Sequence, residues 1–356
     1  MRRLLFGIFL LAAHPLSAQY SYFFQQEYFF GNLPNARVEA MGRANVAVGG
    51  SVASQFFNPA GIGIIEDQEV ALSTSAPFYL LSNSDYYYAG YARRIRPNLV
   101  AAISVNQMAV GPTTFKVDIN NVDYPLDKPK STNIALTAAM EPVKGLHVGI
   151  NANLYRMKFF DDVSTFNALH IDAGALYRLE INPKQHLQFG ASVNNAAKSS
   201  ITFASPLGDE ATSEFPVVAR IGAAYIAETE ITLPGAGTGP LELTFTAEFQ
   251  DVLNNAYRTG ILMGAEARVW NVFSLRLGYL SLNSDDGGLS TNKPRLSNFT
   301  YGFGFQIPLQ TLTDGTVPFD VHLDYVSLEP PSYTFGGTRL SNMRTFGLRL
   351  VWPVGA

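Results

Sequence analysis

The stretch Leu241–Gln250, LELTFTAEFQ, decides the fold. Apolar side chains alternate strictly with polar ones along it, and the strand period of two puts the apolar side chains on one face and the polar ones on the other. Residues 146–154 repeat the pattern, with His147, Gly149, Asn151 and Asn153 as the polar set. The apolar face of the first stretch is predicted to face lipid and comprises Leu241, Leu243, Phe245, Ala247 and Phe249.

Segment length distinguishes a membrane barrel from a soluble sandwich. Soluble strands average about 5–6 residues, whereas a tilted strand needs about 9–11 residues to cross a bilayer. Residues 69–352 contain segments of the longer kind, so the sequence predicts an all-β fold, a 14-stranded antiparallel transmembrane β-barrel. The predicted strands are 69–78, 85–95, 98–110, 131–143, 146–160, 166–179, 186–195, 215–227, 241–251, 257–270, 272–281, 298–307, 318–328 and 344–352.

The connections alternate in length, as short periplasmic turns and long outer loops would. Tight or short connections are predicted at 96–97, 144–145, 180–185 and 271. Longer ones are predicted at 111–130, 196–214, 282–297 and 329–343. The connection 228–240 is longer than a periplasmic turn should be, so the alternation is imperfect.

The N-terminus resembles a secretory signal peptide over residues 1–18, with two arginines, an apolar run and a cleavage site near Ala18. The apolar run is too short to cross a bilayer as a helix. Together with the barrel pattern, it predicts the outer membrane of a Gram-negative bacterium as the location. The last strand ends on Trp352, an aromatic-ended pattern similar to the assembly signal of outer-membrane barrels, and residues 353–356 form a short tail.

Aromatic residues make up 12% of the chain, and many lie near the ends of predicted strands. Such positions favour girdles at the two membrane interfaces. The girdle candidates are Tyr87, Tyr155, Phe159, Tyr177, Tyr225, Tyr257, Trp270, Tyr279, Tyr325 and Trp352.

Residues 19–68 lack the strand pattern and precede the first strand. The lumen of a fourteen-stranded barrel is too wide for wall side chains alone to fill. We therefore expect this segment to be a hatch, or plug, in the lumen. Its turn chemistry is concentrated in Phe56, Phe57, Asn58, Pro59 and Gly61, where Asn-Pro begins a turn and glycine permits a close approach to the wall.

Residues 41–48, MGRANVAV, and 55–62, QFFNPAGI, resemble the N-terminal signature of the FadL-like outer-membrane superfamily. That superfamily contains channels for hydrophobic compounds and the PorV/PorQ proteins of type IX secretion. The Phe-Phe-Asn-Pro-Ala-Gly string is similar to the hatch motif of the channels, whereas residues 36–42, ARVEAMG, look closer to PorV/PorQ.

The resemblance implies two functions. As a PorV/PorQ-like accessory of secretion or surface attachment, the barrel would bind protein partners through its outer loops. Aromatic residues concentrate at interface anchors, so the candidate contacts are Phe115, Tyr124, Tyr333 and Phe335. As a FadL-type passive channel, it would instead take up hydrophobic small molecules such as long-chain fatty acids. The sequence favours the accessory role on length and on residues 37–42.

Catalytic, metal and cofactor signatures are not found in the sequence, so we predict neither an enzyme nor a cofactor. His147 and His322 are the only candidates for lipid hydrolysis and are better explained as wall residues. The net charge of −4 without a basic block argues against nucleic acid. Charged residues on the polar strand faces should form cross-strand ion pairs that brace the barrel or the plug; they are Asp172, Arg178, Arg220, Glu242, Glu248, Glu266, Arg268, Arg276, Asp324 and Arg349.

Overall fold

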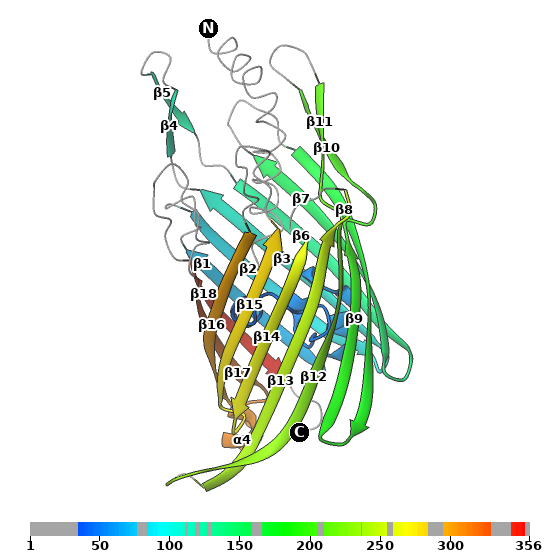
Figure 1. Ribbon diagram of the computed structural model, residues 1–356, viewed down its shortest axis with the longest axis vertical. Coiled ribbons are helices and arrows are strands. Elements are labelled where there is room, and N and C mark those ends of the chain that lie inside the picture. Colours follow the sequence, from blue (N-terminus) through cyan, green and yellow to red (C-terminus); the bar gives the residue numbers. More distant parts are fainter. Residues whose placement is uncertain are drawn as a thin grey trace.

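A computed structural model describes residues 35–76, 84–110, 113–117, 122–126, 130–158, 166–204, 210–235, 237–254, 259–283, 295–328 and 343–352. The signal peptide, residues 19–34, the loop with Tyr333 and Phe335, and the tail 353–356 lie outside these ranges. Within them, the chain forms one upright barrel with a short irregular segment inside it (Figure 1).

The elements inside the barrel are α3 (Ala36–Ala40) and the 3₁₀ helices η2 (Val52–Phe56) and η3 (Pro59–Ile64). The wall strands are β1 (Gln68–Ala76), β2 (Ser84–Arg96), β3 (Leu99–Val110), β6 (Lys130–Val143), β7 (Leu146–Lys158), β8 (Phe166–Asn182), β9 (Gln185–Asn194), β12 (Val218–Leu233), β13 (Gly237–Val252), β14 (Gly260–Val269), β15 (Phe273–Asn283), β16 (Arg295–Ile307), β17 (Asp320–Leu328) and β18 (Met343–Trp352).

The wall is a closed antiparallel meander in which each strand pairs with its neighbours in the chain. It closes where β1 pairs with β18, from Gln68↔Trp352 to Ala76↔Arg344. The predicted 14-stranded barrel is therefore confirmed. Tight turns follow local chemistry: Trp270 and Asn271 both adopt positive φ, 54° and 55°, as the two-residue turns favoured in hairpins require.

Two predicted loops contain hairpins. The segment 111–130 includes β4 (Thr113–Val117) paired with β5 (Val122–Leu126), and 196–214 includes β10 (Ser200–Ala204) paired with β11 (Glu210–Glu214). Both hairpins extend beyond the barrel at the upper end of Figure 1. Sequence pattern missed them because each strand spans only five residues.

The two faces of the wall follow the predicted alternation. On β13, Phe245 and Phe249 are 51% and 46% exposed on the outer face, whereas Glu248 is 2% exposed on the inner face. The predicted lipid face is confirmed at these positions. Among the described residues, no helix is long and apolar enough to cross a membrane; the last one, α4 (Leu309–Leu312), is a single turn between β16 and β17.

Among the girdle candidates that the structure describes, the prediction is wrong for Tyr155; Phe159 and Tyr257 lie outside the described residues. Tyr155 is buried on the inner face of β7, where its ring lies 4.4 Å from that of His170 and 6.4 Å from that of Phe215. Its side chain lies on the same face of β7 as those of Asn151 and Asn153, which also face inward. An aromatic residue near a strand end belongs to the girdle only if the alternation of side chains also places it on the outer face.

The connection 228–240 is not a loop. Most of it continues β12 and β13, which pair without interruption to Leu233↔Gly237, and a turn begins at 234–235. Proline and glycine at 234, 235, 237, 239 and 240 are typical of loops, so the sequence did not predict strands here.

Candidate functional site

The centre of the barrel is occupied by the luminal segment, which we define as residues 35–65 (the dark blue trace in Figure 1). Every residue in it is buried except Arg37, Arg43, Gly50, Phe56 and Ile64. A segment this short has little core of its own, so its fold depends on caps and on the wall.

Polar side chains cap each of its three helical turns. The Asn35 side chain accepts from the amides of Arg37 at 2.8 Å and Val38 at 3.3 Å. Ser51 and Asn58 cap η2 and η3 in the same way, through the amides of Ala53 and Ala60. Side-chain oxygens thus satisfy donors that the short helices leave free.

Inward-facing glycines on six wall strands make room for the luminal segment. They form three pairs across neighbouring strands, which we call the glycine belt: Gly149↔Gly174, Gly190↔Gly222 and Gly264↔Gly278. A Cβ at Gly278 would lie 2.0 Å from the amide nitrogen of Gly42, and one at Gly190 would lie 2.0 Å from the carbonyl oxygen of Val46. Wall and luminal backbones therefore touch, which only glycine permits here.

The predicted hatch motif lies against this belt. The Asn58 amide nitrogen donates to the carbonyls of Val46 and of Ala175 on β8, both at 2.8 Å. It thereby joins two parts of the luminal segment to the wall. Pro59 and Ala60 fill the space beside Gly149, where a Cβ would lie 2.4 Å from their backbone.

The other motif residues pack on neighbouring strands. Phe57 is buried, its carbonyl accepts from the Ser192 hydroxyl at 2.5 Å, and its ring lies 5.8 Å from the Arg220 guanidinium carbon. Phe56 makes an edge contact with Tyr88, with centroids 6.0 Å apart. The Gly61 carbonyl accepts from the Gly50 amide at 2.9 Å and so holds the segment folded on itself.

A chain of ion pairs joins the luminal segment to five strands; we call it the charged arc. Arg37 contacts Glu266 of β14 at 2.5 Å, and Arg276 of β15 contacts Glu266 and Asp324 of β17, each at 2.7 Å. Burial disfavours the charged form of Arg37, but the Glu266 carboxylate outweighs burial and raises the pKa of Arg37 above its ordinary value. The Arg37 end of the arc is therefore ionised.

The arc continues to the other end of the luminal segment. Arg349 of β18 lies 3.6 Å from both Asp324 and Glu69 of β1. Glu69 in turn accepts from the Ser51 hydroxyl at 2.8 Å and from the Val52 amide at 3.1 Å. The ion pairs predicted to brace the barrel are confirmed here, and the luminal segment shields them from water.

A separate carboxylate holds the middle of the segment. Glu248 accepts from the amides of Asn45 and Val46, both at 2.8 Å, and lies 3.2 Å from Arg220. The two histidines that we interpreted as wall residues lie on the wall: His147 lies against Gly63, and His322 lies 3.4 Å from Arg349.

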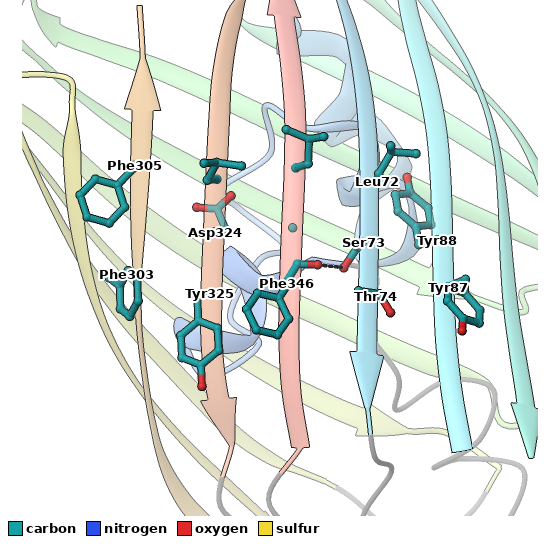
Figure 2. A pocket seen from close by; sticks show the side chains of 13 residues that line it. Leu72, Ser73, Thr74, Tyr87, Tyr88, Phe303, Phe305, Asp324, Tyr325 and Phe346 are labelled. Carbon is teal, nitrogen blue, oxygen red and sulfur yellow. Dashed lines mark hydrogen bonds between the residues drawn. The ribbon is translucent and has the colours of Figure 1, made fainter. Parts of the chain in front are cut away.

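An aromatic groove of about 850 Å³ lies in the wall across β16, β17, β18, β1 and β2 (Figure 2). The Tyr325 ring centroid is 5.2 Å from that of Phe303 and 4.9 Å from that of Phe346. Thr74, paired with Phe346 and Tyr87 on its two sides, is the polar residue among these rings. We call this feature the wall groove.

Inward-facing residues also line the wall groove, namely Ser73, Tyr88, Asp324 and Gly347. An added Cβ at Gly347 would meet its nearest atom, the Asp324 Cβ, at 3.6 Å, so the inner face has room here. At Gly347 the wall consists of backbone alone, because glycine has no side chain. The neighbouring Ser73 hydroxyl donates to the Phe346 carbonyl at 3.0 Å. Asp324 belongs to both the wall groove and the charged arc.

The predicted loop contacts are placed in part. Phe115 and Tyr124 are paired positions in the backbone register of the β4–β5 hairpin, while Tyr333 and Phe335 lie outside the described residues. Sequence reasoning missed the glycine belt and the wall groove. The sequence contains a signal for each. For the glycine belt it is glycine at positions that the alternation places on the inner face, and for the wall groove it is aromatic residues at outer-face positions on three neighbouring strands.

The sequence matches no family model and no curated protein. Solved structures share the fold. A FadL homologue of Pseudomonas aeruginosa has a TM-score of 0.51 and 11% identity over 90% of this chain and 98% of that chain. The toluene transporter TbuX of Ralstonia pickettii has a TM-score of 0.51 and 10% identity over 90% of this chain and 100% of that chain. The toluene transporter TodX of P. putida has a TM-score of 0.51 and 10% identity over 90% of this chain and 98% of that chain.

Proposed function

We propose that the protein is a passive outer-membrane channel for small hydrophobic molecules. The observation that carries this proposal is the wall groove, an open aromatic groove of about 850 Å³ in the outer surface of the wall. Small-molecule sites occupy about 300–1,000 Å³ and are mostly apolar with a few polar groups. The wall groove fits that description.

At the wall groove the closed wall is thin on its inner side. Gly347 presents no side chain to the inner face, and Ala36 is the nearest luminal residue, with its Cβ 3.8 Å from an added Cβ. A hydrocarbon that leaves the lumen here would enter the membrane among aromatic rings, without crossing water. Solved barrels of the same fold include transporters of toluene.

The outer membrane is the location that fits this surface. Exposed apolar side chains cover the outer wall, among them Leu277 at 66% and Ile221 at 62% exposure. Such a surface is stable only in contact with lipid.

Uptake of deuterated toluene tests the proposal. The full chain is expressed in the outer membrane of a Gram-negative host that lacks its own channel for hydrophobic compounds. Thr74→Trp fills the wall groove, whereas Ile150→Trp adds the same side chain to an outward position on β7. We expect uptake above the empty host, lost in Thr74→Trp and kept in Ile150→Trp. Uptake no faster than in the empty host contradicts the proposal.

A second candidate is the secretion accessory suggested by residues 36–42. The observation in its favour is that the luminal segment is almost fully buried, as a barrel that binds proteins without conducting would allow. Replacing Tyr333 and Phe335 by alanine should then abolish co-purification of protein partners and leave heat-modifiable migration intact. The accessory role fails if the protein purifies alone from its native membrane and a knockout secretes its surface proteins normally. The solved structures of the same fold give the channel more support.

A further inference from the structure

The longest hairpin of the wall continues past the barrel rim as a two-stranded ribbon, residues 228–240, which we call the rim ribbon. Its strands pair up to Leu233↔Gly237, and the pair Glu228↔Glu242 forms its base. The flanking strands stop earlier, because β9 ends its pairing at Ala227↔Gln185 and β14 starts its pairing at Leu241↔Val269. The rim ribbon projects at the lower end of Figure 1, the end with the tight turns.

A tryptophan side chain packs against the rim ribbon at Gly239. The Trp270 indole occupies the space beside Gly239, where a Cβ would lie 1.7 Å from a ring carbon. Tryptophan is enriched at the membrane–water interface. Gly239 pairs with Ile231, so Thr232 and Leu233 of β12 extend beyond this point, a reach of about 7 Å.

One edge of the rim ribbon is open. The Glu228 amide donates to the Lys184 carbonyl at 2.8 Å, so even-numbered residues of β12 direct their N–H and C=O groups away from β13. Among the described residues, no strand lies beside Glu230 and Thr232. The opposite edge is blocked by Pro240, which has no N–H.

Such an edge is a template for another strand, and an isolated two-stranded hairpin is marginally stable in water. Natural proteins protect exposed edges with charged side chains, lysine above all, and with proline, bulges or short strands. The rim ribbon carries glutamate as its only charged residue type, without lysine or arginine, and its pairing is uninterrupted.

The charge of the rim ribbon indicates what would cover the edge. Glu228 lies directly across from Glu242, and like charges in this position are destabilising. Arg268 neutralises Glu242 through an ion pair, but Glu228 and Glu230 are exposed. A cationic strand would relieve this repulsion, whereas a second copy of the chain would add more glutamates to it.

We propose that the open edge of the rim ribbon binds a basic, extended segment of a periplasmic protein by strand addition. Main-chain hydrogen bonds to Glu230 and Thr232 would supply affinity, and the glutamates would select for lysine or arginine. This interaction is independent of the channel function.

Peptide binding to the full chain in lipid nanodiscs tests the proposal. The probe is a fluorescent heptapeptide of alternating lysine and valine. A glutamate–valine peptide tests charge selectivity, and a lysine–proline peptide of equal charge cannot form a strand. Thr232→Pro removes the edge donor, and Thr232→Val keeps it at similar volume. Heat-modifiable migration checks that each variant is folded.

We expect saturable binding of the lysine–valine peptide and no binding of the other two peptides. Thr232→Pro should lower the affinity for the lysine–valine peptide about tenfold or more, and Thr232→Val should change it little. Replacing Glu228 and Glu230 by glutamine should weaken binding and reduce its salt dependence. Three results would overturn the proposal: no binding at millimolar peptide, equal binding of the lysine–proline peptide, or equal affinities of the Thr232→Pro and Thr232→Val variants. If the parent protein is dimeric and the Thr232→Pro variant is monomeric, the edge binds a second copy of the chain instead.

Discussion

Replacing Gly278 by alanine places a methyl group inside the space now filled by the luminal backbone. The new Cβ would lie 2.0 Å from the amide nitrogen of Gly42 and 2.4 Å from the carbonyl carbon of Met41. Both atoms are backbone, so no side-chain rotation can relieve the contact. We expect the luminal segment to shift away from β15 while the barrel wall stays folded.

The magnitude follows from what that shift breaks. The Gly42 amide must move by about 1 Å before the contact reaches 3.0 Å. Such a movement disrupts two hydrogen bonds of 3.0 Å, from the Gly42 amide to the Thr300 hydroxyl and from that hydroxyl to the Ala40 carbonyl. At about 1 kcal/mol each, with about 1–3 kcal/mol for overpacking, the docked segment loses about 3–5 kcal/mol.

Hydrogen exchange with mass spectrometry, on protein in nanodiscs, measures this loss directly. Amides in residues 38–48 should exchange roughly 100- to 4,000-fold faster in Gly278→Ala, since about 1.4 kcal/mol is tenfold. Gly347→Ala is the matched control, because its Cβ would meet nothing closer than 3.6 Å. Alanine is also the better strand residue by about 0.5–1 kcal/mol, so this control should be neutral or slightly stabilised.

Equal exchange in the two alanine variants would refute the argument, because it would mean that the wall and the luminal segment are not in backbone contact. Faster exchange throughout the wall strands of Gly278→Ala would refute it differently, by showing that the glycine serves the barrel rather than the segment.

Three further predictions concern the wall and its contents. Arg276→Leu leaves Asp324 and Glu266 short of a partner and should cost about 3–5 kcal/mol in urea unfolding, against about 1 kcal/mol or less for Arg268→Gln at the rim; similar costs would contradict the charged arc. Leu277→Arg, on the lipid face, should destabilise the folded barrel in liposomes by about 2–4 kcal/mol, and an unchanged urea midpoint would place β15 away from lipid. Deleting residues 20–60 should leave a folded barrel with faster small-solute leakage, and unchanged leakage would show that this segment does not obstruct the lumen.

The sequence alone determined the barrel, because strand alternation is a local property. Whether Phe245 or Glu248 faces lipid depends only on parity along β13, which a period of two fixes within a few residues. Strand number followed from the same periodicity and from turn chemistry. Charge pairing was predictable in kind, since charged residues on the inner face of a wall must find partners or water.

Other features depended on register and curvature around the closed wall. Arg37 meets Glu266 across 229 positions in the chain, and nothing in local periodicity indicates which strand a luminal residue will reach. The glycine belt acquires meaning only when Gly264 and Gly278 are brought opposite each other behind Met41 and Gly42. Tyr155 was misplaced for a related reason, because position along a strand was weighed without its face.

The rim ribbon shows the same division. Proline and glycine in 228–240 predicted a loop, yet pairing between β12 and β13 continues to Leu233↔Gly237. The wall groove likewise needs β16, β17, β18, β1 and β2 side by side, which closure between the first and last strands alone provides. Sequence determined which face each side chain takes, because alternation is set within a strand; tertiary structure decided which side chains meet, because shear and closure set the pairing of distant strands.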